Sequence, residues 1–275
     1  MNKKEKIGII GWGIVGHALS EGFKDHEIHV YDKYKETEPL EEVVKKSDFI
    51  FICVPTPMKK GHIDLSIMDE DVAQIVKYTD NTVKIVIIKS TVVPGTTASY
   101  QTRYPNTRFV FNPEFLREAS YIDDFKFPDR IVIGTDNESA GKRVEDLYRK
   151  RFPDCPIIIT HPTSAELAKG MSNSLLATIV IFNNVIYDIC TALKIDFNEV
   201  AKIVALDRRY QNVDYFAVSK ERGFGGKCLP KDLNELANRA KELGVDAGFL
   251  EKVWSENLRI RKDHDWEWIP GAESN

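Results

Sequence analysis

The sequence predicts a doubly wound α/β fold, in which a mostly parallel sheet is followed by a smaller, all-helical part. Three observations lead to this prediction. Seven short apolar runs without strict polar alternation occur in the first 160 residues, a glycine-rich turn follows the first run, and no such run occurs later. Strands without alternation are covered on both faces, which is typical of parallel sheets.

The seven runs are separated by polar segments with helical spacing, as in repeated strand–helix units. They are Ile7–Ile10, Ile28–Tyr31, Phe49–Val54, Val83–Lys89, Arg108–Phe111, Arg130–Ile133 and Pro156–Thr160. Alternation of strands and helices is the pattern of a nucleotide-binding sheet. We therefore expect a first domain over residues 1–160.

Helical periodicity dominates after residue 160. Thr163-Ser164-Ala165-Glu166 has the spacing of a capping box, and an apolar-periodic stretch runs from it to about Leu193. Within it, Leu175–Ile189 is expected to be a buried helix. Further helices are expected at 198–206, 231–243 and 249–259. We expect a central helical domain over residues 161–261 and a tail over 262–275, whose tryptophans, Trp266 and Trp268, suggest docking.

The composition is that of a soluble globular protein, with 43% hydrophobic and 29% charged residues and a formal net charge of -4. This charge offers no basic excess for nucleic acid, and the apolar stretches are too short or too interrupted for a signal peptide or a membrane span. The four cysteines show neither zinc-ligand spacing nor a disulfide framework. We expect a cytoplasmic protein without metal, nucleic-acid or membrane partners, and with Cys53 and Cys190 in the core.

The glycine-rich turn Gly11-Trp12-Gly13-Ile14-Val15-Gly16 follows the first run and opens a helix. The first glycine permits a tight turn, the second lets the backbone approach a pyrophosphate, and the third lets helix and strand pack closely. Asp32 ends the second run, where a carboxylate accepts hydrogen bonds from ribose hydroxyls and repels a 2′-phosphate. The pattern predicts a Rossmann-like domain that binds NAD rather than NADP, a preference that Lys33 and Lys35 weaken without reversing.

The most unusual segment is Gly223-Phe224-Gly225-Gly226-Lys227-Cys228-Leu229-Pro230-Lys231-Asp232. Its glycines let the backbone press against a ligand, and Cys228 is expected to be exposed, with Lys227 and Lys231 near enough to stabilise a thiolate. Taken alone, the segment is also compatible with a glycine-rich turn that holds an incidental cysteine.

Lys169 and Asn173 are spaced i, i+4 and share one helix face. Such a pair can polarise a hydroxyl or stabilise an oxyanion, although a solvated face shows the same residues. Val54–Pro57, Ser90–Gly95 and Asn112–Glu118 follow strands at the expected ligand edge. The last of these segments carries two carboxylates suited to acid–base work, which could also be ordinary residues of a helix N-terminus.

These residues together resemble the UDP-glucose and GDP-mannose dehydrogenase family. Six motifs stand in the family's order and approximate spacing: GWGIVG, VPTP, STVVPGTT, NPEFLRE, the KxxxN pair within AELAKGMSN, and GFGGKCLPKD. The resemblance implies NAD-dependent oxidation of a nucleotide sugar at carbon-6, with UDP-glucose as the leading substrate. Two hydride transfers through a cysteine thioester would give the uronate.

The resemblance also implies roles for single residues. Cys228 would be the nucleophile, Lys169 and Asn173 would hold the sugar and the oxyanion, and Asp232 would position or activate a water. Glu114 would be a general acid/base, with Thr91 and Glu118 at the junction of cofactor and substrate. The expected cofactor-binding residues are Gly11, Gly13, Ile14, Val15, Gly16, Asp32, Lys35, Val54, Pro55, Thr56, Ser90, Thr91 and Glu118. The expected substrate-binding residues are Glu114, Phe115, Leu116, Glu118, Lys169, Asn173, Arg209, Phe224, Gly225 and Cys228.

The resemblance further implies a homodimer through the central helical domain, with Arg209, or alternatively Arg208, reaching the sugar site of a neighbouring subunit. The family normally continues into a second α/β domain, which is not expected in this chain. Two other functions stay open. One is a single-oxidation dehydrogenase of the 3-hydroxyacid type, which needs no thiol, and the other is a non-catalytic NAD- or nucleotide-sugar-binding protein.

Overall fold

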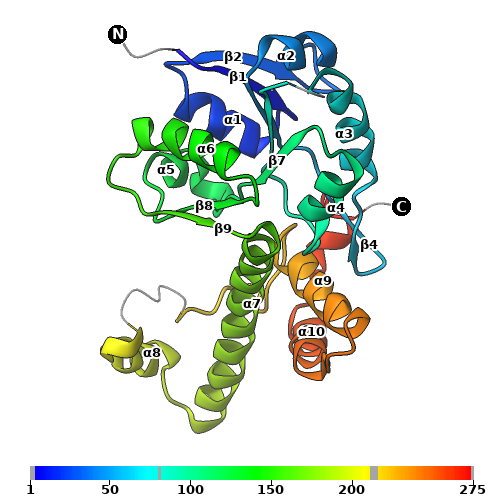
Figure 1. The fold of residues 1–275 in the computed structure, drawn as a ribbon. Coiled ribbons are helices and arrows are strands. Elements are labelled where there is room, and N and C mark those ends of the chain that lie inside the picture. The colour runs from blue at the N-terminus through cyan, green and yellow to red at the C-terminus, as the bar shows by residue number, and fades with distance from the viewer. Residues whose placement is uncertain (1–3, 80–81, 211–215, 274–275) are drawn as a thin grey trace. The chain divides into compact units, whose positions relative to one another are not determined.

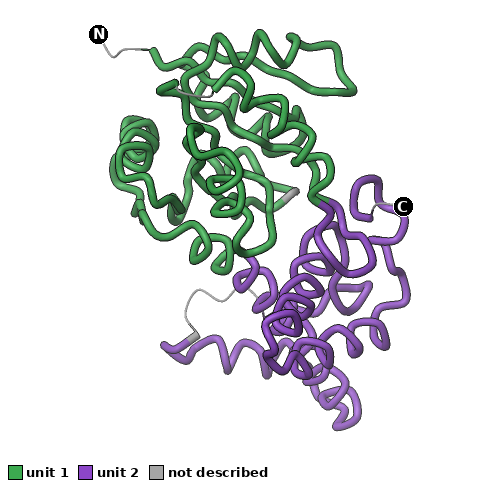
Figure 2. Tube along the Cα trace, turned by 45° about the vertical axis from the view of Figure 1, so that its right-hand side comes forward, with its two compact units in different colours: residues 1–56, 65–169 green, residues 57–64, 170–275 purple. Residues whose placement is uncertain are grey.

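The computed structural model describes residues 4–79, 82–210 and 216–273, without the side chains of Glu118 and Tyr210. The chain forms two compact units (Figure 2). Unit 1 comprises Met1–Thr56 and Leu65–Lys169, and unit 2 comprises Pro57–Asp64 and Gly170–Asn275. The predicted domain boundary near residue 160 stays a proposal, based on the end of the last strand of the sheet at Thr160.

Unit 1 is built on a seven-stranded sheet with the order β2-β1-β3-β6-β7-β8-β9 (Figure 1). The strands are β1 (Lys6–Ile10), β2 (Glu27–Tyr31), β3 (Phe49–Ile52), β6 (Ile85–Ile88), β7 (Arg108–Phe111), β8 (Ile131–Gly134) and β9 (Ile157–Thr160). All neighbours are parallel except β7 and β8. Each strand lies within two residues of a predicted run, so the predicted doubly wound, mostly parallel sheet is confirmed.

Helices cover both faces of this sheet, and successive strand residues point into two different cores. The helices on one face are α1 (Ile14–Gly22), α5 (Tyr121–Lys126) and α6 (Glu138–Arg151), and those on the other are α2 (Leu40–Lys46), α3 (Ser66–Thr79) and α4 (Thr96–Arg103). In β1, Ile9 packs into the first core and Ile10 into the second. Burial on both faces explains why the runs lack polar alternation.

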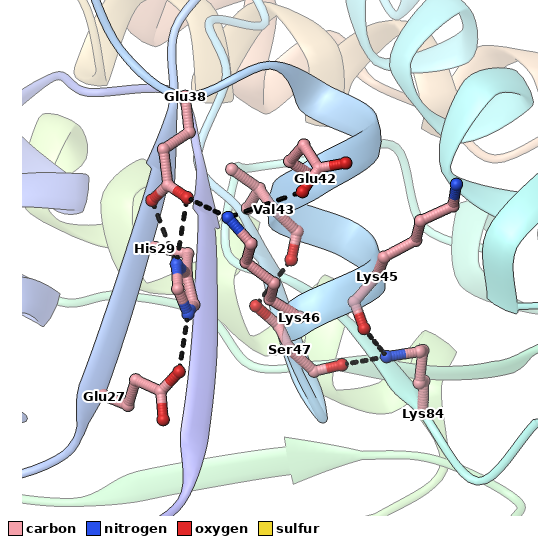
Figure 3. Close-up of polar contacts among 9 residues, drawn as sticks. All are labelled: Glu27, His29, Glu38, Glu42, Val43, Lys45, Lys46, Ser47 and Lys84. Carbon is pink, nitrogen blue, oxygen red and sulfur yellow. Dashed lines mark hydrogen bonds and ion pairs between the residues drawn. The ribbon is translucent and has the colours of Figure 1, made fainter.

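Polar contacts fasten α2 and the edge strand β2 to their surroundings (Figure 3). The Lys84 ammonium donates hydrogen bonds to the carbonyl oxygens of Lys45 and Ser47, at the end of α2. On β2, the Nδ1 atom of His29 lies 3.0 Å from a carboxylate oxygen of Glu38. These contacts hold the edge of the sheet from which the predicted ribose-binding position extends.

Unit 2 is mainly helical in its described part. It contains residues 170–193 of α7 (Pro162–Leu193), with α8 (Phe197–Ala205), η2 (Arg208–Tyr210), α9 (Leu229–Glu242), α10 (Gly248–Ile260) and η3 (Asp265–Glu267). The helices predicted after residue 160 are therefore confirmed. Its main core joins α7, α9 and α10 through Ala177, Ile181, Leu233 and Val253, with Phe224 from the glycine-rich segment.

A short hairpin of β4 (Met58–Lys59) and β5 (His62–Ile63), which sequence patterning does not predict, belongs to unit 2. The backbone N–H of Ile63 donates to the buried Glu235 carboxylate over 2.6 Å. Met58 packs against Trp266, which is 3% exposed, whereas Trp268 is 65% exposed. The tail therefore docks through one of its two tryptophans.

The expected capping box at the start of α7 is wrong. The helix begins at Pro162, and the Glu166 carboxylate does not turn back on its own helix. It accepts hydrogen bonds from the backbone N–H groups of Gly95 and Thr97 over 2.5 and 2.8 Å. Glu166 thus caps α4, because the first N–H groups of a helix lack partners within it.

The expectation of a buried helix over Leu175–Ile189 is also wrong in part. The segment is helical, but Leu175 and Phe182 are more than half exposed, and 28% of the most apolar window of α7 is buried. Among the described residues, α7 is the one helix long and apolar enough to cross a membrane by length and composition. The core helix of a soluble protein passes the same test, so this finding is weak support for a membrane span.

Candidate active site

The glycine-rich turn and Asp32 lie together at the carboxyl ends of β1 and β2. The Asp32 Oδ2 atom accepts a hydrogen bond from the backbone N–H of Trp12 over 2.8 Å. The Lys35 ammonium donates to the carbonyl oxygen of Trp12 over 2.5 Å. Gly11 has a φ of +97°, and a Cβ atom on it would lie 2.7 Å from the carbonyl oxygen of Cys53. The turn is therefore fixed from both sides, and Gly11 is needed for its backbone conformation.

The surroundings of the other two glycines differ. A Cβ atom on Gly16 would lie 2.3 Å from the carbonyl oxygen of Gly11, so α1 and β1 pack closely there. A Cβ atom on Gly13 would meet no atom within 4 Å. Ile14 is partly exposed and Val15 packs against the core. Space at the N-terminus of α1, where N–H groups favour an anion, fits the pyrophosphate of NAD.

The predicted cofactor segments after β3 and β6 are joined by hydrogen bonds. The Ser90 hydroxyl donates to the carbonyl oxygen of Val54 over 2.7 Å, and the Thr56 hydroxyl donates to that of Thr91 over 2.8 Å. Pro55, between Val54 and Thr56, is exposed. These residues share the strand edge with the glycine-rich turn, as expected for the ligand edge of such a sheet.

Glu114 and Lys169 form a largely buried ion pair in unit 1. The Lys169 Nζ atom lies 3.1 Å from Glu114 Oε1, and the side chains are 4% and 14% exposed. Lys169 also lies over the ring of Phe115, and the backbone N–H of Leu116 donates to Glu114 Oε2 over 2.6 Å. Burial alone would raise the pKa of Glu114, but the Lys169 ammonium and the Leu116 hydrogen bond lower it overall. The carboxylate is therefore ionised and able to accept a proton.

A buried lysine, Lys89, lies behind this pair and is a residue that motif reasoning misses. Its ammonium donates to Asn112 Oδ1 and to the carbonyl oxygen of Pro113, each over 3.2 Å. Burial lowers the pKa of Lys89 to about 8, while the negative charge of Glu114 opposes this shift. A lysine that ends an apolar strand run is the sequence signal that could have identified it.

Cys228 lies in unit 2 at the beginning of α9, as its N-cap residue, and is exposed as predicted. The partial positive charge of a helix N-terminus favours negative charge on such a side chain. The backbone N–H of Asp232 donates to the carbonyl oxygen of Cys228 over 2.9 Å, within the first turn of α9. The Asn173 side chain donates to Asp232 Oδ2 over 2.5 Å. Within the described residues, the buried Asp232 Oδ1 atom has no hydrogen-bond partner.

The remaining cysteines differ from Cys228. Cys190 is buried and Cys53 packs against the core of unit 1, which confirms the predicted core positions. Burial raises the pKa of the Cys53 thiol to about 12, so it stays protonated. Cys155 donates from its thiol to the carbonyl oxygen of Pro128. The described part of the chain contains no disulfide and no group of three potential metal-ligating side chains.

Three further predicted residues have other surroundings, and the side chain of a fourth is not described. The Phe224 side chain is 4% exposed and lies in the core of unit 2, and Gly225 is closely packed by neighbouring side chains. The Arg209 guanidinium pairs with the Asp207 carboxylate, with a shortest distance of 2.6 Å. The side chain of Glu118, at the start of η1 (Glu118–Ser120), lies outside the described residues. The structure thus groups Glu114 and Lys169 within unit 1 and Asn173, Cys228 and Asp232 within unit 2.

Comparison with known proteins gives two matches to one family. Residues 29–152 match the NAD binding domain of the UDP-glucose/GDP-mannose dehydrogenase family, and residues 163–259 match its central domain. The chain is 33% identical over 232 residues to a UDP-glucose 6-dehydrogenase of Rickettsia conorii, covering 82% of this chain and 52% of the relative. It is 34% identical over 239 residues to a GDP-mannose 6-dehydrogenase of Pseudomonas syringae pv. tomato, covering 82% and 54%.

A solved UDP-glucose dehydrogenase from the hyperthermophilic archaeon Pyrobaculum islandicum is similar in structure. It has a TM-score of 0.82 and 29% sequence identity, covering 94% of this chain and 68% of that protein. The chain spans about half the length of the curated relatives that it matches. The matched segments cover most of the chain and include the NAD-binding domain of the family. The chain therefore belongs to the UDP-glucose/GDP-mannose dehydrogenase family.

Proposed function

We propose that this chain oxidises carbon-6 of a nucleotide sugar, with UDP-glucose as the leading substrate, to the carboxylate. The primary alcohol, two NAD⁺ and one water would give the uronate, two NADH and three protons. Family membership supports the reaction class. UDP-glucose leads because the Rickettsia relative and the archaeal structure are both UDP-glucose dehydrogenases by name, and a GDP-mannose enzyme among the relatives makes GDP-mannose the second candidate.

The observation that carries the proposal is the position of Cys228. An exposed thiol at a helix N-terminus is poised to act as a nucleophile, because its thiolate is favoured there. One turn further, the buried carboxylate of Asp232 has one oxygen bound to Asn173 and another without a partner in the described residues. A buried, unpaired carboxylate oxygen is costly, which supports a ligand such as water there.

NAD would be held by the turn at Gly13 and by Asp32, and when bound it supplies the hydride acceptor for both oxidations. Glu114, ionised beside Lys169, would take the proton of the sugar hydroxyl as the aldehyde forms. The Cys228 thiolate would then bond to the aldehyde carbon. Lys169 and Asn173, one turn apart on α7, would stabilise the negative charge on the carbonyl oxygen.

The second oxidation converts this adduct into a thioester. A water hydrogen-bonded to Asp232 Oδ1 would add to the thioester carbonyl, and the carbon–sulfur bond would break, so that the uronate leaves and the Cys228 thiolate is restored. Glu118 and Thr91 are proposed at the junction of cofactor and substrate. Arg209, with Arg208 as the alternative, is proposed to serve the sugar site of a neighbouring subunit.

A panel of nucleotide sugars tests the proposal, with NADH measured by absorbance and sugar consumption by chromatography. Two NADH per UDP-glucose are expected. One NADH per sugar would indicate a single-oxidation dehydrogenase, and NAD binding without turnover on any sugar would indicate a non-catalytic binding protein. Turnover of GDP-mannose without turnover of UDP-glucose would overturn the choice of UDP-glucose but not the reaction class.

Cysteine variants test the thioester. Cys228→Ser is expected to abolish the second oxidation, because a serine hydroxyl, unlike a thiolate, is not ionised near neutral pH and does not add to the aldehyde to form the adduct that is oxidised. Cys155→Ser, a partly exposed cysteine in unit 1, is the matched control and is expected to retain two NADH per sugar. A Cys228→Ser protein that still forms two NADH per sugar would contradict the thioester.

A homodimer through the helical part and a cytoplasmic location complete the proposal. Large apolar side chains on α7, α8 and the following turn are exposed, including Phe182, Leu193, Ile203 and Leu206. Exposed apolar patches of this kind are typical of protein interfaces. Sedimentation velocity is expected to give twice the chain mass, and Phe182→Glu with Ile203→Glu is expected to give the monomer. A monomeric parent protein would refute the dimer.

A further inference from the structure

The glycine-rich segment before Cys228 is held by three side chains from the end of unit 2. Asn257, on α10 and fully buried, binds both polar groups of the Phe224 backbone. Its Oδ1 atom accepts from the Phe224 N–H over 2.8 Å, and its Nδ2 atom donates to the Phe224 carbonyl over 3.0 Å. This two-point contact fixes the peptide planes on either side of Phe224.

Asp265 and Arg261 hold the segment on both sides of that contact. Asp265 Oδ1 accepts a hydrogen bond from the Gly226 N–H over 3.0 Å, and Asp265 Oδ2 accepts one from the Arg261 guanidinium over 2.9 Å. The same guanidinium donates to the carbonyl oxygen of Arg222 over 3.2 Å. Four backbone groups between residues 222 and 226 are thus bound by Asn257, Arg261 and Asp265, which we call the loop clamp.

The glycines of the segment fit the loop clamp closely. A Cβ atom on Gly225 would lie 2.2 Å from Asp265 Oδ1 and 2.6 Å from the Arg261 guanidinium carbon. A Cβ atom on Gly223, which has a φ of +58°, would lie 2.5 Å from Asn257 Oδ1. Only Gly226, among the three described glycines, has no atom within 4 Å of a Cβ position. A side chain at Gly223 or Gly225 would therefore displace side chains of the loop clamp.

The clamp is itself anchored in a small apolar cluster. Trp266, next to Asp265, is buried against Met58 and Ala272. Its ring lies 5.2 Å from the ring of Trp254 on α10 and stacks on His264, with ring centroids 4.8 Å apart. Packing on both sides of Asp265 limits the directions in which its carboxylate can point.

We propose that Asn257, Arg261 and Asp265 are positioning residues that hold the glycine-rich segment so that Cys228 stays at the N-terminus of α9. This proposal rests on the proposed nucleophilic role of Cys228. In the proposed reaction, the loop clamp does not bind the sugar. Its effect is expected on the cysteine-dependent steps and not on NAD binding, because the nucleotide turn lies in the other unit.

Asp265→Leu removes both hydrogen bonds of the carboxylate, and Asp265→Asn restores an acceptor for the Gly226 N–H. Glu267→Gln is the matched control, because Glu267 lies in the same turn but is exposed, and its carboxylate pairs with His264 rather than with the glycine-rich segment. Alkylation of Cys228 by iodoacetamide, followed by mass spectrometry of its peptide, reads the thiol without requiring turnover. NADH per UDP-glucose and the Kd for NAD are measured on the same proteins.

Asp265→Leu is expected to slow alkylation at pH 7 at least threefold, to lower NADH per sugar below two, and to leave the Kd for NAD within twofold. Asp265→Asn is expected to recover most of both losses, and Glu267→Gln to match the parent. Unchanged alkylation and stoichiometry in folded Asp265→Leu, or equal losses in Glu267→Gln, would overturn the proposal. If Asp265→Leu does not fold, Arg261→Lys takes its place with the same criteria. This variant keeps the charge but cannot bind the Arg222 carbonyl and the Asp265 carboxylate at the same time, as the guanidinium does. If no sugar is oxidised by the parent protein, the proposed function fails, while alkylation still decides the clamp.

Discussion

Replacing single glycines of the turn between β1 and α1 by alanine should separate the stability of the turn from its binding of NAD. The two informative positions are Gly16 and Gly13. A Cβ atom on Gly16 would lie 2.3 Å from the carbonyl oxygen of Gly11, whereas a Cβ atom on Gly13 would meet no protein atom within 4 Å. The first substitution is thus opposed by the fold, and the second only by a ligand.

The magnitudes follow from these distances. Contacts of a Cβ atom below 3.0 Å are essentially never seen, so Gly16→Ala requires α1 and the turn to move apart by about 0.7 Å. Overpacking costs about 1–3 kcal/mol, at the upper end here because the neighbour is backbone, while the higher helix propensity of alanine returns about 1 kcal/mol. The expected net loss in the free energy of unfolding is about 2 kcal/mol.

Gly13→Ala has the opposite profile. Gly13 has a φ of -92° and a ψ of -162°, which alanine adopts without strain, so the loss of stability is expected to stay below about 1 kcal/mol, the range for an alanine N-cap. A methyl group in the space expected for the pyrophosphate should raise the Kd for NAD at least tenfold, or about 1.4 kcal/mol.

Urea unfolding followed by circular dichroism and calorimetric titration with NAD measure the two quantities on each variant. The reasoning is refuted if Gly13→Ala binds NAD within twofold of the parent protein, because the pyrophosphate then does not occupy that space. It is equally refuted if Gly16→Ala unfolds at the urea concentration of the parent, because the contact between α1 and β1 then yields without cost.

Three further substitutions have definite expected outcomes. Burial and the charge of Glu70 raise the pKa of Asp71 to about 6. The protonated carboxyl therefore contributes stability below pH 4, and this contribution is lost as the pH rises through 6. Asp71→Asn should add about 1–2 kcal/mol to the free energy of unfolding in urea at pH 7.5 and almost nothing at pH 4. Lys89→Met removes a positive charge that lowers the pKa of Glu114. The acid limb of the profile of kcat/KM, measured between pH 5 and 9, should therefore move to higher pH. An unchanged acid limb would exclude Glu114 as the titrating base. Gly170→Ala, in the interior of α7 with no atom within 4 Å of its Cβ position, should add about 0.5–1 kcal/mol to the free energy of unfolding and so raise the midpoint temperature of thermal unfolding; a lower midpoint would contradict the open space.

The strands of unit 1 could be predicted from the sequence because burial on both faces requires continuous apolar runs, which are visible in the local sequence. β7 coincides with its predicted run, and the other strands differ from theirs by at most two residues at either end. The hairpin of β4 and β5 shows no such run, since each strand has two residues. Its partners are Glu235 and Asn238 on α9, far along the chain, and local patterns contain no information on such contacts.

The candidate site shows the same division between local and distant information. Motif order predicts Cys228, Lys169, Asn173, Glu114 and Asp232. The structure adds that Lys169 pairs with Glu114 and that Asn173 binds Asp232. The loop clamp could not be predicted, because Asp265 lies in a segment with no clear period and its contact is with a backbone N–H rather than with another motif. The glycines of the segment predict a backbone that can press against a ligand, and the structure adds that the Asp265 carboxylate lies beside Gly225.

The polar residues of α7 bear on how this apolar helix should be understood. Glu166 and Lys169 are almost fully buried, and each carries its charge against a specific partner, the start of α4 and the Glu114 carboxylate. A buried charge is tolerated when it is paired or hydrogen-bonded; within unit 1, Lys169 is paired with Glu114, and Glu166 accepts hydrogen bonds from backbone N–H groups. A helix that spans lipid would have to hide these same groups from hydrocarbon at several kcal/mol each. The Lys169–Glu114 ion pair and the hydrogen-bonded Glu166 therefore favour protein packing around the start of α7. The proposed dimer would cover its exposed apolar face.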